Sequence, residues 1–265
     1  MFSLPKSRLF EVHLTMYFHA HEYIYLTYFN DEIIALDLRQ DQYIFLSEFS
    51  EVIYLALNNE FKQVQEKFVL AINGESCLPD DFEEAIEYLR EIGILSKNTH
   101  NYPYIRRLKK EGFSAGAPNV DWRMSSSDLD NKVTKKMILE AYILLIKVYF
   151  ILKVFGFYGL VKAIKQRGGG CIKRDAKEFN VLVTALNKAC FYFPVRTKCL
   201  EWSAALTFMG LRRKWQCNME IGVQNLPFAA HAWVKADDRV IADTENLPET
   251  LSVILSEPFA KGAIK

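Results

Sequence analysis

In the first part of the chain, short apolar runs lie between polar residues, as in a series of β-strands joined by turns. Three runs are rich in β-branched and aromatic residues, and polar turn residues at 30–31 and 39–41 separate them. These runs predict three short strands over Tyr23–Phe29, Glu32–Asp37 and Gln42–Leu46.

The pattern then changes to the three- to four-residue spacing of amphipathic helices. In one segment, Val64, Phe68 and Ile72 recur on one face. Three helices are predicted over Glu48–Asn58, over Phe61–Asn73 and from Pro79 to Gly93. Strands and helices together predict a small domain over residues 23–97. Residues 1–22 precede this domain and are predicted to be an N-terminal extension. The alternative is that Met16 is the true start of the protein.

Residues 98–130 are predicted to form a linker, because Gly, Pro and the run Ser125-Ser126-Ser127 interrupt any periodic pattern. A second domain is expected over residues 131–265.

The strongest helical pattern of the second domain is the apolar segment Lys135–Lys165. Lys147 and Lys153 interrupt it, so its longest uncharged run falls far short of the roughly 20 residues of a membrane span. No transmembrane segment is therefore expected. The pattern favours a buried helix, with peripheral membrane contact as the alternative. The prominent apolar positions are Leu139, Ile143, Ile146, Phe150 and Val154.

The composition permits two small domains and argues against nucleic acid as a partner. The chain has 265 residues, half of them hydrophobic, and a formal net charge of +1. It therefore has no strongly basic field. The third predicted helix is acidic and would repel phosphate. Its acidic residues include Glu83, Glu84, Glu87 and Glu91.

The five cysteines are widely spaced and odd in number, and they suggest neither a disulfide framework nor a zinc site. They are Cys77, Cys171, Cys190, Cys199 and Cys217. Free thiols and the absence of a signal-peptide pattern predict a reducing cytoplasm. The run Gly168-Gly169-Gly170 lacks the Lys-Ser/Thr of a phosphate-binding loop, so no cofactor is expected.

Candidate chemistry resides in Cys199, His231 and Asp243, which follow one another in the order nucleophile, base and orienter. Cys199 is predicted to lie in the first turn of a helix with Thr197 as its N-cap. The positive end of a helix favours thiolate, and a neighbouring imidazolium favours it further. Each residue alone is more often structural, but the combination points to acyl-transfer chemistry.

The sequence around Ala236-Asp237-Asp238 predicts a hairpin between the strands that carry the histidine and the aspartate. A three-residue turn pairs Lys235 with Arg239 and places His231 opposite Asp243. A two-residue turn would shift the register by one and point the two side chains to opposite faces.

The segment Cys199–Asp243 resembles the catalytic segment of lasso peptide biosynthesis B proteins, which are bacterial leader peptidases with a transglutaminase-like cysteine protease fold. The resemblance covers roughly residues 180–256. Its motifs are Cys199-Leu200, Leu211-Arg212-Arg213, Ile221-Gly222-Val223, Pro227-Phe228, His231-Ala232-Trp233-Val234, Asp243 and Leu251-Ser252-Val253-Ile254.

The resemblance implies that Cys199 is the nucleophile, His231 the general base and Asp243 the orienter. Trp202 and Gln224 stand where many members of the family carry arginine, and these changes are expected to alter substrate contacts.

Residues 23–97 resemble, more loosely, the winged-helix-like precursor-peptide recognition element of ribosomal peptide pathways. The resemblance implies that a leader peptide pairs with the third strand and packs on the third helix. The expected peptide-binding residues are Tyr43, Ile44, Phe45, Phe82, Ile86 and Leu89, for each of which an ordinary core role is the alternative.

We therefore expect an α+β protein with an N-terminal winged-helix-like recognition domain and a C-terminal papain/transglutaminase-like cysteine protease domain. The implied function is removal of the leader from a lasso peptide precursor in the bacterial cytoplasm. The implied partners are that precursor and an ATP-dependent, asparagine-synthetase-like cyclase. An acyltransferase with the same triad and a non-catalytic peptide chaperone remain as alternatives.

Overall fold

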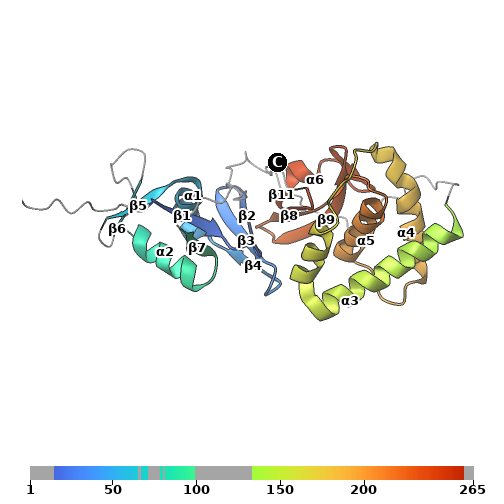
Figure 1. Ribbon diagram of the computed structural model, residues 1–265, viewed down its shortest axis with the longest axis horizontal. Coiled ribbons are helices and arrows are strands. Elements are labelled where there is room, and N and C mark those ends of the chain that lie inside the picture. Colours follow the sequence, from blue (N-terminus) through green and yellow to red (C-terminus); the bar gives the residue numbers. More distant parts are fainter. Residues whose placement is uncertain (1–14, 65–66, 71–77, 80, 99–132, 260–265) are drawn as a thin grey trace, which may run out of the picture. The chain divides into compact units, whose positions relative to one another are not determined.

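The computed structural model describes residues 15–64, 67–70, 78–79, 81–98 and 133–259 and shows a mixed α+β protein. The chain divides into two compact units (Figure 1). The smaller unit combines Met1–His21 with Glu48–Leu108, and the larger unit combines Glu22–Ser47 with Lys109–Lys265. This division differs from the expected domain limits, because residues 22–47 group with the second half of the chain.

The smaller unit is built on an antiparallel sheet with the strand order β6-β5-β1-β7. Its strands are β1 (Thr15–Ala20), β5 (Phe61–Val64), β6 (Lys67–Leu70) and β7 (Leu95–Asn98). Its helices are α1 (Ser50–Asn58), which follows a 3-10 turn at Ser47–Phe49, and α2 (Phe82–Glu91). The rings of Phe18 and Phe82 both pack on the buried ring of Phe61, with centroids 5.4 and 5.5 Å away.

Two expectations for this unit are wrong. Within the predicted helix over Phe61–Asn73, residues 61–64 and 67–70 instead form the paired strands β5 and β6, and the rest of that range lies outside the described residues. Its apolar residues recur every four positions, which is also a multiple of the strand period. Residues 15–20 are not an extension, because β1 pairs with both β5 and β7. The predicted first and third helices are confirmed as α1 and α2, and Gly93 lies just beyond α2 at φ 76°.

The larger unit contains the three predicted strands as the sheet β2-β3-β4, with bounds Ile24–Phe29, Glu32–Asp37 and Gln42–Phe45. One face of this sheet contributes Tyr25, Ile34 and Leu36 to the core of the unit. The Tyr25 hydroxyl donates to Glu257 Oε1 at 2.8 Å, and the backbone N–H of Tyr158 donates to the carbonyl of Leu38 at 3.1 Å. These contacts explain why the three strands belong to this unit.

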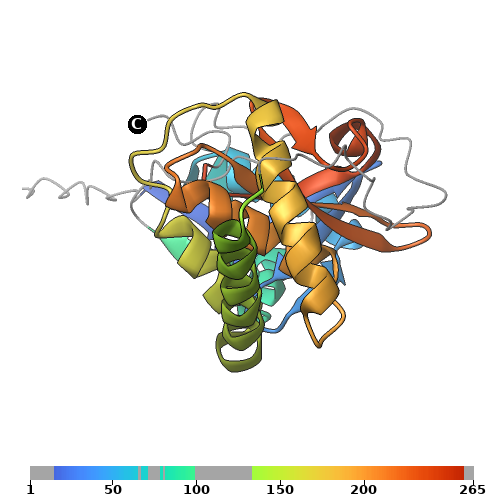
Figure 2. The same cartoon turned by 90° about the vertical axis from the view of Figure 1, so that its right-hand side faces the viewer.

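A second antiparallel sheet has the order β10-β9-β8-β11. Helix α5 packs on β9 of this sheet, and α3 and α4 both pack against α5 (Figure 2). The strands are β8 (Asn218–Gln224), β9 (Ala229–Ala236), β10 (Arg239–Ile241) and β11 (Ser252–Glu257). The helices are α3 (Lys135–Lys165), α4 (Asn180–Tyr192), α5 (Cys199–Arg212) and α6 (Leu247–Thr250), with a 3-10 turn at Ala176–Phe179.

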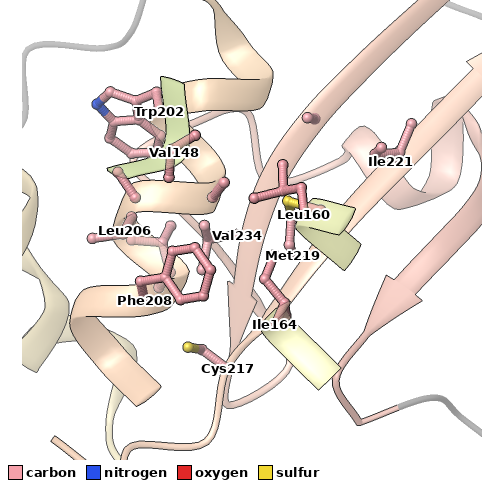
Figure 3. Close-up of a cluster of buried hydrophobic side chains, with 14 of the residues drawn as sticks. Val148, Leu160, Ile164, Trp202, Leu206, Phe208, Cys217, Met219, Ile221 and Val234 are labelled. Atoms are coloured by element: carbon pink, nitrogen blue, oxygen red, sulfur yellow. The ribbon is translucent and has the colours of Figure 1, made fainter. Parts of the chain in front are cut away.

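The core of the larger unit lies between α3, α5 and the second sheet (Figure 3). Each of these elements supplies large apolar side chains that are almost fully removed from water. This packing holds α5, and with it the start of that helix, against β9. The side chains include Val148, Leu160, Ile164, Trp202, Leu206, Phe208, Met219, Ile221 and Val234.

Helix α3 confirms the predicted helical segment, with a break at Gly156, which has φ 64°. Its buried face is formed by Ala141, Leu144, Leu145 and Val148. The prominent apolar positions predicted from the sequence to be buried are instead largely on the outer face. Among the described residues, no helix is long and apolar enough to cross a membrane.

Candidate active site

Cys199 is the first residue of α5, where backbone N–H groups at the start of the helix are directed toward its side chain. The N-cap is Lys198 rather than the expected Thr197. The Lys198 backbone N–H donates to Glu201 Oε2 at 3.1 Å, which satisfies the first turn in the manner of a capping box. The Thr197 hydroxyl is buried and has no hydrogen-bond partner in the described part of the chain.

His231 lies on β9, is 5% exposed, and contacts Asp243 directly. Its Nε2 lies 2.7 Å from Asp243 Oδ2. The other oxygen of the carboxylate accepts a hydrogen bond from the Thr244 backbone N–H at 2.8 Å. The carboxylate is therefore held in place and leaves the second ring nitrogen, Nδ1, for the thiol of Cys199.

The hairpin before Asp243 does not have the expected register. Arg239 pairs with Ala236, so the turn has two residues, Asp237 and Asp238, with φ 49° and 60°. Continued regularly, this register would point His231 and Asp243 to opposite faces. Strand β10 instead ends at Ile241, and Ala242 adopts φ 55°. This left-handed residue turns the chain, so that the Asp243 side chain meets the imidazole.

The ionisation of the site favours a thiolate–imidazolium pair. Burial opposes the charged form of both groups, but their attraction for one another and the surrounding contacts outweigh it. The pKa of Cys199 is lowered by His231 and by hydrogen bonds with the backbone of Ala232 and Leu200. Asp243 and Cys199 raise the pKa of His231 from 6.5 to about 9.

Ser203 connects the helix of the thiol to the strand of the imidazole. It lies one helical turn after Cys199, is fully buried, and its Oγ donates to the carbonyl of Ala232 at 3.0 Å. Ala232 follows His231 directly in β9. We infer that this bond sets the position of Cys199 relative to His231. No sequence motif singled out Ser203, because its role depends on a contact between distant segments.

The expected peptide-binding residues fall into two groups. Phe82, Ile86 and Leu89 lie on α2 and are at most 1% exposed. They belong to the core of the smaller unit, so the expected direct contact with a peptide is contradicted by their burial. Tyr43 and Phe45 lie on β4 in the larger unit, with Ile44 between them.

Strand β4 is linked to the loop that leads into β9. The ring of Phe228 in this loop lies 5.2 Å from that of Tyr43 and 5.5 Å from that of Phe45, centroid to centroid. The same loop is tied to the sheet by a hydrogen bond from Asn225 Nδ2 to Glu32. Tyr43 lies close enough to Cys199 for the thiolate to contribute, after burial and Asp41, to the raised pKa of its hydroxyl. Phe228 therefore joins β4 to the loop before β9, and in the sequence only the Pro-Phe motif pointed to this residue.

The two departures from the family pattern are structural in this protein. Trp202 is 5% exposed and its Nε1 donates to Asn187 Oδ1 at 2.9 Å, which links α5 to α4. Gln224 is 2% exposed and its side-chain amide donates to the Pro227 carbonyl at 2.9 Å. Both side chains face the protein interior, which argues against the expected change in substrate contacts.

Trp233 and Gly222 pack together beside the histidine, since Gly222 pairs with His231 and the Trp233 ring lies 6.2 Å from the imidazole. The indole Nε1 of Trp233 donates to Glu220 Oε2 at 3.0 Å. A Cβ at Gly222 would lie 2.6 Å from this indole and 2.7 Å from the Cβ of Leu251. The glycine of the Ile-Gly-Val motif therefore serves close packing. In the described part of the chain, no group of three His, Cys, Asp or Glu side chains could hold a metal ion.

Parts of this chain are similar to a protein superfamily and to a curated protein. Residues 142–256 match the Transglutaminase-like superfamily. A stretch of 59 residues is 37% identical to the Microcin J25-processing protein McjB of Escherichia coli, covering 22% of this chain and 28% of that protein. The chain thus spans less than a third of the length of this relative. No solved structure shows a significant match. The two matches confirm the resemblance to lasso peptide biosynthesis B proteins.

Proposed function

We propose that this protein is a cysteine peptidase that removes the leader from a lasso peptide precursor. Its transglutaminase-like domain and its resemblance to lasso peptide biosynthesis B proteins support the proposal. The observation that carries the proposal is the 2.7 Å contact of His231 with Asp243, next to a cysteine at the start of a helix. Cleavage precedes closure of the macrolactam by a partner cyclase of the asparagine-synthetase type.

In the proposed mechanism, the Cys199 thiolate attacks the carbonyl carbon of the leader–core peptide bond. The negative charge that develops on the carbonyl oxygen is stabilised by the Cys199 backbone N–H. His231 protonates the departing amine and then removes a proton from the water that hydrolyses the acyl-enzyme. Asp243 keeps the imidazole oriented throughout.

We propose that the leader binds as an added strand on β4. Within the described residues, β4 pairs only with β3, so its other edge offers backbone donors and acceptors to an extended peptide. Tyr43 and Phe45 share a face with Leu36 and Ile34, against which they pair, and meet Phe228 near the catalytic histidine. A peptide on β4 would therefore run close to Cys199.

The sheet β2-β3-β4 is proposed to act as the precursor recognition element, in keeping with the expectation that the leader pairs with the third strand. Because β4 groups with the larger unit, binding is best tested in the full chain. Ile44→Pro removes a backbone donor from β4 and should weaken leader binding, measured by fluorescence anisotropy. Ile92→Ser, at an exposed position after α2, is the control and should bind as the wild type does.

The catalytic assignment is tested with Cys199→Ala and His231→Ala, each incubated with a lasso precursor peptide that the wild type cleaves and followed by mass spectrometry. Both should abolish cleavage without lowering the melting temperature by more than a few degrees. Cys171→Ala, at a partly exposed cysteine outside the site, is the matched control and should cleave normally. Wild-type cleavage by Cys199→Ala would exclude a cysteine peptidase.

Two other functions give different results in the same assay. An acyltransferase with this triad would transfer the leader acyl group to an added amine, so that the product carries the mass of the amine instead of water. A non-catalytic peptide chaperone would support maturation equally well with Cys199→Ala.

A further inference from the structure

The outer face of α3 is apolar although it is exposed. Four residues spaced by four and seven positions form a stripe opposite the buried face of the helix. Single exposed apolar residues are ordinary, but an aligned stripe of large ones is typical of an interaction surface. The stripe consists of Leu139, Ile143, Phe150 and Val154, which are 60%, 51%, 60% and 66% exposed.

The charge along this helix is strongly positive. Lysines occur at six positions of α3, and its one acidic residue is Glu140. Glu140 already has two cationic partners. The Arg213 guanidinium lies 2.7 Å from Glu140 Oε2, and Arg212 Nε lies 3.5 Å from Glu140 Oε1. The exposed lysines Lys136 and Lys153 flank the apolar stripe by helical periodicity.

Two cations lie against the ring of Phe208 in α5, and one of them, Lys147, belongs to the same helix as the stripe. Lys147 Nζ lies 5.5 Å and Arg167 Cζ 5.1 Å from the centroid of that ring. Burial, followed by the charges of Arg167 and Arg212, lowers the pKa of Lys147. An anion placed among these three side chains would relieve their mutual repulsion.

We propose that the outer face of α3 and the Lys147–Arg167–Arg212 cluster bind the surface of an anionic membrane. Apolar side chains along one helix would enter the interfacial region while flanking lysines contact lipid phosphates. Charge complementarity favours lipid, since the basic residues are distributed along the whole stripe. The proposal is independent of the leader peptidase function.

The active site lies apart from the basic cluster. Arg212 ends α5 and Cys199 begins it, and the helix has 14 residues. At 1.5 Å per residue the two ends lie about 20 Å apart. The thiol therefore lies at the end of α5 that is distant from the basic cluster.

The test is co-sedimentation of the full chain with two kinds of vesicle, one of phosphatidylcholine and one of phosphatidylcholine and phosphatidylglycerol in equal parts. The protein should bind the anionic vesicles, less strongly at high salt. Phe150→Ser should lower the partition coefficient, and Lys153→Glu should lower it by about five-fold or more. Ile172→Ser and Arg239→Glu alter an exposed apolar residue and an exposed cation elsewhere, and should bind as the wild type does.

Absence of binding to anionic vesicles would overturn the proposal, as would equal binding to both vesicle types. It would also fail if Phe150→Ser and Lys153→Glu matched their controls. Concentration-dependent dimerisation without vesicle binding, abolished by Phe150→Ser, would assign the surface to a second copy of the chain instead.

Discussion

Asp243 contacts the imidazole of His231 from a hairpin whose regular register would place it opposite Ala232. Strand β10 ends two residues before the carboxylate, and Ala242 changes the chain direction at φ 55°. A local backbone conformation, rather than strand pairing, thus completes the His–Asp pair. Since alanine rarely adopts positive φ, the surrounding structure holds it there.

The backbone at Ala242 should be sensitive to side-chain shape. Ala242→Gly removes the Cβ that disfavours positive φ and should preserve cleavage and stability. Ala242→Val places a β-branched residue in the same conformation and should cost about 1–3 kcal/mol of unfolding free energy and most of the activity. Urea denaturation and initial cleavage rates measure the two effects. Equal activity of both variants would show that the left-handed turn is not needed.

The pH dependence of cleavage should be bell-shaped, because attack needs a thiolate beside an imidazolium. Activity should rise as Cys199 ionises, below the ordinary thiol pKa, and fall as His231 loses its proton near pH 9. Asp243→Asn removes a contact that raises the pKa of His231. It should move the alkaline limb to lower pH and reduce kcat roughly 100- to 10,000-fold. An unchanged alkaline limb would assign that limb to another group.

The contact between His231 and Asp243 also makes the stability of the fold depend on pH. The pKa of His231 is raised from 6.5 to about 9 in the folded state, so its contribution to stability is complete below pH 6.5 and is lost as pH rises through about 9. Asp243→Asn should show a smaller loss of stability over this range in thermal denaturation.

The hydroxyl of Ser203 should matter more for turnover than for substrate binding. Ser203→Ala removes the bond from α5 to the carbonyl of Ala232, and should lower kcat with little change in KM and about 1 kcal/mol loss of stability. Thr207→Ala is the matched control, since Thr207 is also buried but its Oγ1 bonds within α5, to the Ser203 carbonyl. An equal fall in kcat for both variants would reduce Ser203 to a general role in stability.

The side chains packed around Gly222 leave no room for a methyl group. Gly222→Ala forces the indole of Trp233 or the Leu251 side chain to move and should destabilise the protein by about 1–3 kcal/mol. Gly169→Ala, where nothing lies within 4 Å of the added Cβ, should be close to neutral. Urea denaturation measures the midpoint of unfolding of each variant. Similar midpoints for the two variants would contradict the packing argument.

The contact between His231 and Asp243 could be predicted from the sequence, because short motifs at fixed spacing carried the resemblance. The register between the histidine and the aspartate was not predictable, since it depends on the conformation of Ala242. Periodicity identified α3 but not its buried face, because both faces of that helix are apolar. The predicted helix that begins at Phe61 was wrong for a related reason, because a four-residue repeat fits a strand as well as a helix.

The grouping of β4 with the larger unit has a consequence for the length of the substrate. If strand and thiol belong to one body, a peptide held on β4 presents its backbone to Cys199 at a set distance along the chain. An extended peptide advances about 3.3 Å per residue, so one inserted residue would move the scissile bond by about that length. The protein would then act as a molecular ruler, which selects its cleavage site by counting residues from the bound segment.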